Sequence, residues 1–168
     1  EIFLALEPGQ SVVLRCSTQP HPAGEPLWAS WEAAGEAVPL ACRWQVRFLQ
    51  GGPALPAPFT TETLGSWTNL EDTHAPAFAG TALYATEFDA PNGAVEQWRL
   101  DLGKVCQSAR VRLNGRDLGT LIAPPFWVTT GPLKNKGNTL EIEVTSVAAN
   151  RIRELDRRGV KWRNFHDI

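Results

Sequence analysis

Residues 109–146 read ARVRLNGRDLGTLIAPPFWVTTGPLKNKGNTLEIEVTS and contain the most regular pattern of the chain. Valine and leucine alternate with arginine over 110–113, and leucine, isoleucine and valine alternate with glutamate over 140–144. This period of two predicts strands with one face in a core and the other in water. Asn114-Gly115 supplies the two positive-φ residues of a type I′ hairpin. The stretch therefore predicts an antiparallel sheet.

Further strands are predicted on both sides of this stretch. A strand is expected over 40–48, with Trp44, Val46 and Phe48 pointing inward. The other strands are expected over 10–15, 82–88, 95–102 and 126–129. Regular strands separated by turn residues are typical of a β-sandwich or jelly roll. We therefore predict one all-β domain over residues 1–168.

The segments between these strands carry weaker signals. Residues 51–57, GGPALPA, predict a turn-rich connection that cannot be a central strand. Residues 60–79 predict a long irregular loop, and 21–36 a loop or weak strands around Trp28 and Trp31. One short helix is expected over 148–158, with Gly159 as its C-cap.

Composition excludes several classes of protein. With 168 residues, 43% hydrophobic and 20% charged, the chain is predicted to be globular rather than disordered. A net charge of −2 gives no electrostatic reason to bind nucleic acid or an anionic membrane. No apolar run is long enough to span a bilayer. The chain has no Met and no signal-peptide pattern, so we expect a piece of a longer protein.

The three cysteines cannot all pair with one another. Cys16 and Cys42 are each in phase with apolar neighbours, which predicts that both point into the core. They are then either two buried free thiols, the favoured alternative, or a disulfide bridge. No CxxC or Cys/His grouping indicates zinc.

Several motifs in the same order resemble a known family. They are Asn114-Gly115 with Leu118-Gly119, then 125–128, 133–144, the upstream elements 44–48, 51–53, 66–68, 78–84 and 100–103, and the downstream 150–152. Together they are similar to the galactose-binding-like jelly-roll domain of large glycoside hydrolases, found in family 2 enzymes and in the C-terminal part of family 106 rhamnosidases. The resemblance covers about residues 9–164. Relatives continue past residue 168 with a further strand, so the last strand is expected to be missing or supplied differently here.

The resemblance implies a domain that does not itself catalyse. In these families the catalytic carboxylates lie in a separate barrel, and adjacent Glu71 and Asp72 would make a poor acid–base pair on extended backbone. We expect a non-catalytic carbohydrate-binding module of an extracellular or periplasmic bacterial polysaccharide-degrading enzyme. Its partners would be a polysaccharide or oligosaccharide and the parent enzyme's catalytic domain. The alternatives are a structural domain that supports the barrel and, less favoured, a small hydrolase or lyase.

Seven tryptophans provide candidates for stacking on sugar rings. Trp44 and Trp98 share the phase of core residues. Trp67, Trp127 and Trp162 are the predicted stacking residues, with burial against the parent barrel as the alternative.

Polar partners for sugar hydroxyls are predicted on the long loop and near the helix. The candidates are Asn69, Glu71, Asp72, Asn150 and Arg151. Asn150 could equally be a helix N-cap.

The sequence requires no cofactor, although many domains of this family carry a structural calcium ion. Asp72, Asp89 and Asp101 could contribute ligands to such an ion, but no spacing defines a site.

Overall fold

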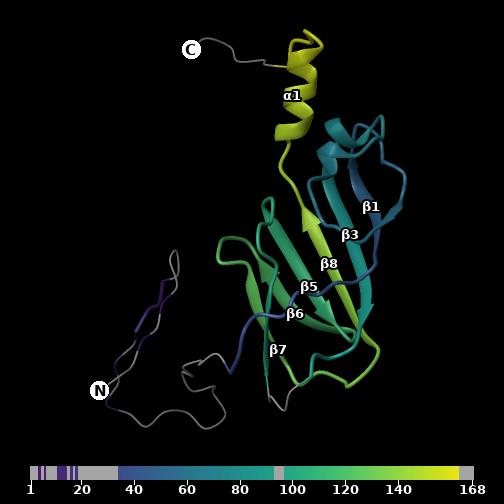
Figure 1. Ribbon diagram of the computed structural model, residues 1–168. Helices are drawn as coiled ribbons and strands as arrows, with labels where there is room; N and C mark the ends of the chain where they lie inside the picture. Colours follow the sequence, from purple (N-terminus) through teal and green to yellow (C-terminus); the bar gives the residue numbers. More distant parts are fainter. Residues whose placement is uncertain are drawn as a thin grey trace.

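The computed structural model describes residues 4, 6, 11–14, 16, 18, 34–92 and 97–162. These residues form two antiparallel sheets and one α-helix (Figure 1). The larger sheet has the strand order β2-β1-β3-β8-β5-β6, and β4 pairs with β7 in the smaller. The strands are β1 (Trp44–Gly52), β2 (Phe59–Thr61), β3 (Ala79–Phe88), β4 (Trp98–Asp101), β5 (Ser108–Leu113), β6 (Arg116–Leu121), β7 (Trp127–Gly131) and β8 (Asn138–Thr145). The predicted all-β sandwich is confirmed.

One face of the large sheet forms the core. The register aligns Val46, Tyr84, Ile142 and Val111 across β1, β3, β8 and β5. Val46, Ile142 and Val111 are buried and Tyr84 is half-buried. This row, with the parallel rows above and below it, is the hydrophobic surface that the period of two predicted.

Two groups of side chains pack on this inner face. Leu100 of β4 and Val128 of β7 contact the core from the small sheet, which gives the sandwich its second layer. Trp67 and Phe78 fill the core beside Phe48, with all three rings in edge-to-face contacts. They come from the short 3-10 helix η1 (Trp67–Asn69) and from the residue after η2 (Ala75–Ala77).

The predicted hairpin is confirmed. β5 and β6 pair in antiparallel register on either side of Asn114-Gly115, whose φ angles are +52° and +79°. Val111 and Leu113 are buried, and Arg110 is exposed on the opposite face. Local turn chemistry and the alternating pattern agree here, because an Asn-Gly turn matches the twist of the strands that it joins.

The prediction that 51–57 is a turn-rich connection and cannot be a central strand is wrong for its first two residues. Gly51 and Gly52 belong to β1, where Gly51 faces Gly80 of β3. A Cβ atom on either Gly51 or Gly80 would overlap the neighbouring backbone and the Phe78 ring. The two strands can approach this closely only because both positions are glycine. Gly51 therefore extends β1 instead of ending it.

The N-terminal predictions are largely wrong where the structure describes them. Residues 11–14 form no strand, and Val13 is 95% exposed. Cys16 is exposed rather than inward, Cys42 is half-buried, and both thiols are free. The predicted strand over 40–48 begins only at Trp44, although Trp44, Val46 and Phe48 are inward as expected. Trp28 and Trp31 lie outside the described residues.

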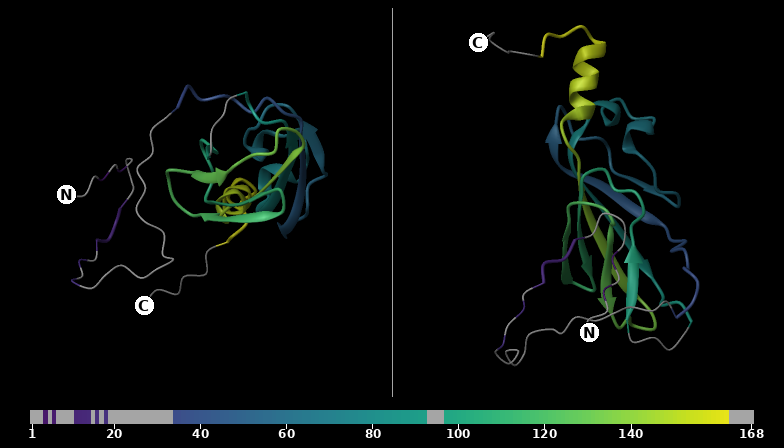
Figure 2. Two further views of the ribbon diagram at one scale, coloured as in Figure 1. Left: turned by 90° about the horizontal axis from the view of Figure 1, so that it is seen from below. Right: turned by 90° about the vertical axis from the view of Figure 1, so that its left-hand side faces the viewer.

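The predicted C-terminal helix is confirmed as α1 (Ala149–Arg157), which stands beyond the end of the large sheet (Figure 2). Gly159 has a φ of +65°, and its N–H donates to the Asp156 carbonyl, as a C-cap does. The helix packs against η2. Within the described residues, no helix combines the length and apolar character needed to cross a membrane.

Candidate carbohydrate-binding surface

Trp67 does not present a stacking surface. Its side chain is 6% exposed, and its ring centroid lies 5.9 Å from that of Phe48 and 5.7 Å from that of Phe78. Its Nε1 is buried without a hydrogen-bond partner among the described residues. The ring therefore belongs to the core, and the prediction of a sugar-stacking role for Trp67 is wrong for the fold described.

The carboxylate of Asp72 is held by backbone N–H groups of its own loop and of Ala57. Oδ1 accepts hydrogen bonds from the N–H groups of His74 (2.7 Å) and Ala75 (3.0 Å), and Oδ2 accepts one from Ala57 (3.2 Å). These bonds, with that from His74 the strongest influence, hold the pKa of Asp72 below its usual value. Both oxygens thus fix the loop, which leaves Asp72 with little remaining acceptor capacity for sugar hydroxyls.

Asn69 and Glu71 lie on the same loop as Asp72 and are exposed. Their side chains are accessible to a ligand. The rigid anchor at Asp72 between η1 and η2 holds the backbone around them.

Asn150 ties the helix to the loop. It lies in the first turn of α1, after the N-cap residue Ala148, and its Nδ2 donates to the Phe78 carbonyl at 3.3 Å. The alternative prediction of Asn150 as N-cap is therefore wrong. Arg151 beside it is half-buried. Trp162 lies close to the helix, where its Nε1 donates to Asp156 Oδ1 at 3.4 Å.

Trp127 lies on the outer face of the small sheet, as predicted. Phe126 is buried and Val128 packs against the core, so the intervening side chain points to the other face. The guanidinium of Arg99, on the neighbouring strand, lies 5.2 Å from the centre of the Trp127 ring. This cation–π contact covers part of one ring face. Trp98, predicted as core, is only half-buried.

The carboxylates suggested as calcium ligands serve separate turns. Asp89 Oδ1 accepts the N–H of Gly137, and Asp101 Oδ1 accepts that of Gly103. In the part of the chain that the structure describes, no three His, Cys, Asp or Glu side chains come together as a metal site would require.

The outer face of the large sheet carries a feature that sequence reasoning missed. A depression of about 410 Å³, open to solvent, lies over β2, β1 and β3. Its lining includes buried Leu83, half-buried Ala85 and exposed Gln45, Arg47 and Thr60 of the outer face, with Pro58 and with Val46 and Phe59, whose side chains belong to the core side. The volume falls within the range of small-molecule sites, about 300–1,000 Å³.

Strand register explains this depression. Arg47 lies opposite Leu83, which in turn lies opposite Glu143, so the short side chains of β3 sit between long side chains on β1 and β8. An apolar floor is thus bordered by polar groups. Such a surface can pack on the apolar face of a sugar ring while the border donates and accepts hydrogen bonds.

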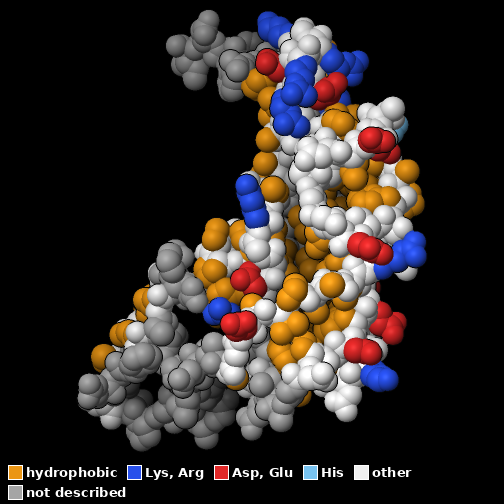
Figure 3. Space-filling view, viewed as in Figure 1, with side chains coloured by type: hydrophobic (Ala, Val, Ile, Leu, Met, Phe, Trp, Pro, Cys, Tyr) orange, Lys and Arg blue, Asp and Glu red, His pale blue; other side chains and the backbone are white. Residues whose placement is uncertain are grey.

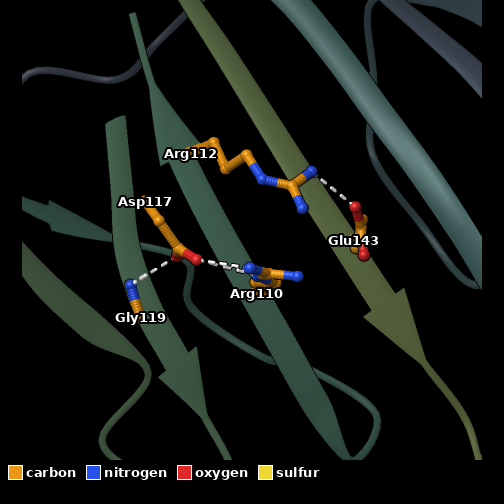
Figure 4. Close-up of polar contacts among 5 residues, drawn as sticks. All are labelled: Arg110, Arg112, Asp117, Gly119 and Glu143. Atoms are coloured by element: carbon orange, nitrogen blue, oxygen red, sulfur yellow. Dashed lines mark hydrogen bonds and ion pairs between the residues drawn. The ribbon is translucent and has the colours of Figure 1, made fainter. Parts of the chain in front are cut away.

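Ion pairs order the other half of this outer face (Figure 4). Arg112 Nη1 and Glu143 Oε1 are 2.6 Å apart, and Arg110 Nη2 and Asp117 Oδ2 are 2.5 Å apart. The hydrogen bond from Arg110 lowers the pKa of Asp117 and raises that of Arg110. These four side chains are engaged with one another, although those of Arg110 and Asp117 remain exposed, whereas the Arg47 side chain at the depression has no such ion pair among the described residues.

Comparison with known proteins links the chain to carbohydrate-active enzymes. The "Putative beta-glucuronidase" of Formosa agariphila is 28% identical over an alignment of 162 positions, which covers 86% of this chain and 13% of that protein. The structure of a rhamnosidase from Novosphingobium sp. PP1Y is 31% identical, with a TM-score of 0.62 over 79% of this chain and 13% of the enzyme. The chain resembles a small part of large glycoside hydrolases. The resemblance indicated by the sequence motifs is thereby confirmed.

Two further comparisons limit what this similarity shows. A GH2 β-galacturonidase from Eisenbergiella tayi, with glycerol bound, matches at 22% identity and a TM-score of 0.50 over 62% of this chain and 18% of the enzyme. At that identity it supports the shared fold alone. No family model matches the chain. Because the chain spans only 13% of the rhamnosidase and of the glucuronidase-like relative, their activities describe those whole proteins.

Proposed function

We propose that this chain is a non-catalytic carbohydrate-binding module of a bacterial glycoside hydrolase that acts outside the cytoplasm. The depression over β2, β1 and β3 carries the proposal, because it combines an apolar floor with exposed amide, guanidinium and hydroxyl groups. Its ligand is a polysaccharide or oligosaccharide. An open site of this kind supports modest affinity, with Kd on the order of 10 μM to 1 mM, or about 4 to 7 kcal/mol.

Trp127 remains a candidate secondary contact. Its ring is half-buried on the outer face of the small sheet and already shares one face with Arg99. A sugar could use only the surface that Arg99 leaves accessible. We therefore assign Trp127 a smaller contribution than the depression.

Affinity electrophoresis tests this function. The purified chain is run in gels that contain pectic galacturonan, galactan, xylan or β-glucan, beside Ala85→Trp, which fills the depression, and Trp127→Ala. We expect at least one polysaccharide to retard the wild type and Ala85→Trp to abolish the retardation. Circular dichroism of Ala85→Trp verifies its fold. Absence of retardation in every gel, with and without calcium, would refute a carbohydrate-binding function.

A second candidate function is structural support of the parent enzyme's catalytic domain. Three exposed apolar side chains favour it, because they follow strand ends on the side of the sheet from which α1 extends. Leu55 follows β1, Ile122 follows β6 and Val147 follows β8, with exposures of 49%, 77% and 49%. Figure 3 also shows hydrophobic side chains gathered along the middle of the face that it displays. Exposed apolar surface of this kind is typical of domain interfaces.

A further inference from the structure

The outer face of β1 carries two cations beside the depression. Gln45 and Arg47 lie on β1, and Arg43 is the residue before it. The three are exposed and two positions apart, so their side chains point to the same side of the sheet. At about 3.3 Å per residue, the two arginines are roughly 13 Å apart along the backbone. This spacing suits more than one sugar residue of a chain laid along the strand.

The two guanidinium groups differ in what they contact. Arg43 Nη2 donates to Thr60 Oγ1 at 3.3 Å, and Thr60 lines the depression, so the Arg43 guanidinium lies at its border. The Arg47 side chain forms no hydrogen bond or ion pair with any other residue that the structure describes, and it lines the depression directly. An arginine without a protein carboxylate keeps its planar set of donors available for an anionic ligand.

Two acidic side chains of this face lie on the β8 side of the depression, whereas exposed Glu62 follows β2 and exposed Glu87 lies on β3 itself. Glu141 and Glu143 of β8 lie opposite Ala85 and Leu83 of β3. Arg112 neutralises Glu143 at 2.6 Å, and Glu141 remains as a negative charge beyond Ala85. A ligand carboxylate would therefore be attracted to the Arg47 guanidinium and repelled from Glu141.

We propose that the depression binds an acidic glycan, one that contains uronic acid residues, through its carboxylate groups. Arg47 and Arg43 donate to the carboxylates, Gln45 contacts a hydroxyl between them, and the sugar ring lies over half-buried Ala85. This assignment rests on the proposed carbohydrate-binding function and adds the chemical class of the ligand. Charge-assisted hydrogen bonds from arginine to carboxylate give the acidic glycan its advantage over a neutral one.

The test compares one polymer in two charge states. Polygalacturonate and its fully methyl-esterified form have the same backbone, but only the first carries carboxylates. Binding of the wild type, Arg47→Gln and Arg43→Gln to both polymers is measured by isothermal titration calorimetry at two salt concentrations. Arg153→Gln, on the exposed surface of α1, changes the net charge by the same amount and is the matched control.

We expect the acidic polymer to bind at least about tenfold more tightly than the ester. Arg47→Gln should remove about tenfold of that affinity, Arg43→Gln less, and Arg153→Gln none. Added salt should weaken binding of the acidic polymer only. Equal binding of both polymers, unchanged in Arg47→Gln, would overturn the acidic-glycan proposal while preserving the carbohydrate-binding function. Absence of binding to these two polymers and to the neutral glycans would overturn both.

Discussion

The side chain of Asn138 holds that of Asn114, 24 residues earlier in the chain, through a 3.0 Å hydrogen bond from Asn114 Nδ2 to Asn138 Oδ1. Asn138 is fully buried and also bonds the backbone of Lys134 twice and the carbonyl of Phe88. Asn114 in turn accepts the N–H of Thr139. One buried amide thus joins the β5–β6 turn, the start of β8 and the end of β3.

Replacing Asn138 should therefore destabilise the fold. Asn138→Ala leaves three partly buried backbone groups, two of Lys134 and one of Phe88, without these partners, and we expect a loss of about 3 kcal/mol in the free energy of unfolding. Urea denaturation measures this loss. The exposed neighbour Asn135→Ala is the control, with a change within about 0.5 kcal/mol. Equal stability of the two variants would show that the Asn138 network contributes nothing.

Trp67 and Trp127 should have opposite phenotypes. Trp67→Ala removes a core ring packed between Phe48 and Phe78, and we expect a loss of about 3–5 kcal/mol. Trp127→Ala should lose less than half as much, since that ring is only half-buried. Denaturation of both variants measures the difference. A stable Trp67→Ala protein that fails to bind glycan would contradict the assignment of Trp67 to the core.

Tyr84 should titrate at unusually high pH. Burial, with a smaller contribution from Cys106, raises the pKa of Tyr84 from 10.0 to about 12. The unfolded chain releases this proton first, so the stability that the neutral phenol contributes is complete below about pH 10. It is lost as the pH rises towards 12, by on the order of 2 kcal/mol.

Tyr84 is the single tyrosine of the chain, so tyrosinate absorbance reports on it alone. An alkaline titration should place its midpoint near 12 in the folded protein. The Tyr84→Phe variant has no phenol, so the part of the alkaline loss of folding stability that the Tyr84 phenol causes should be absent. A midpoint near 10 in the folded protein would contradict its burial beside the core.

Asp72 should contribute stability only while it is ionised. Backbone N–H groups, that of His74 foremost, lower its pKa below 3.8, so its contribution is present above about pH 3.8 and is lost as the pH falls below that value. Asp72→Ala should therefore be less stable than the wild type at neutral pH, with the difference shrinking in acid. Glu71→Ala, at an exposed adjacent position, should match the wild type throughout. A pH-independent difference would show that the carboxylate charge is irrelevant.

The elements that sequence predicts correctly are those with local signals. The Asn114-Gly115 turn, the alternation in β5 and β8 and the Gly159 cap each depend on a few adjacent residues. The position of Trp67 has no such signal, because an irregular loop has no periodicity that would show which way a ring points. Its burial depends on Phe78, which the chain reaches only after two short 3-10 turns.

The depression escaped prediction for a related reason. It exists because Arg47 lies opposite Leu83, a contact fixed by pairing between strands 36 residues apart. Alternation within β1 shows that Arg47 faces outward, but not which residue of β3 lies beside it. The continuation of β1 through Gly51 likewise depends on Gly80 in the neighbouring strand β3. Non-local register therefore limits what one sequence reveals about its surface.

Chemical-shift mapping tests the location of the proposed carbohydrate site most directly. The ¹⁵N-labelled chain is titrated with a soluble oligogalacturonide and followed by amide resonances. We predict saturable shifts that cluster at Gln45, Arg47, Thr60, Leu83 and Ala85, and their loss in Ala85→Trp. Saturable shifts confined to the small sheet around Trp127, or the absence of any shift with acidic and neutral oligosaccharides alike, would contradict a carbohydrate site on the outer face of the large sheet.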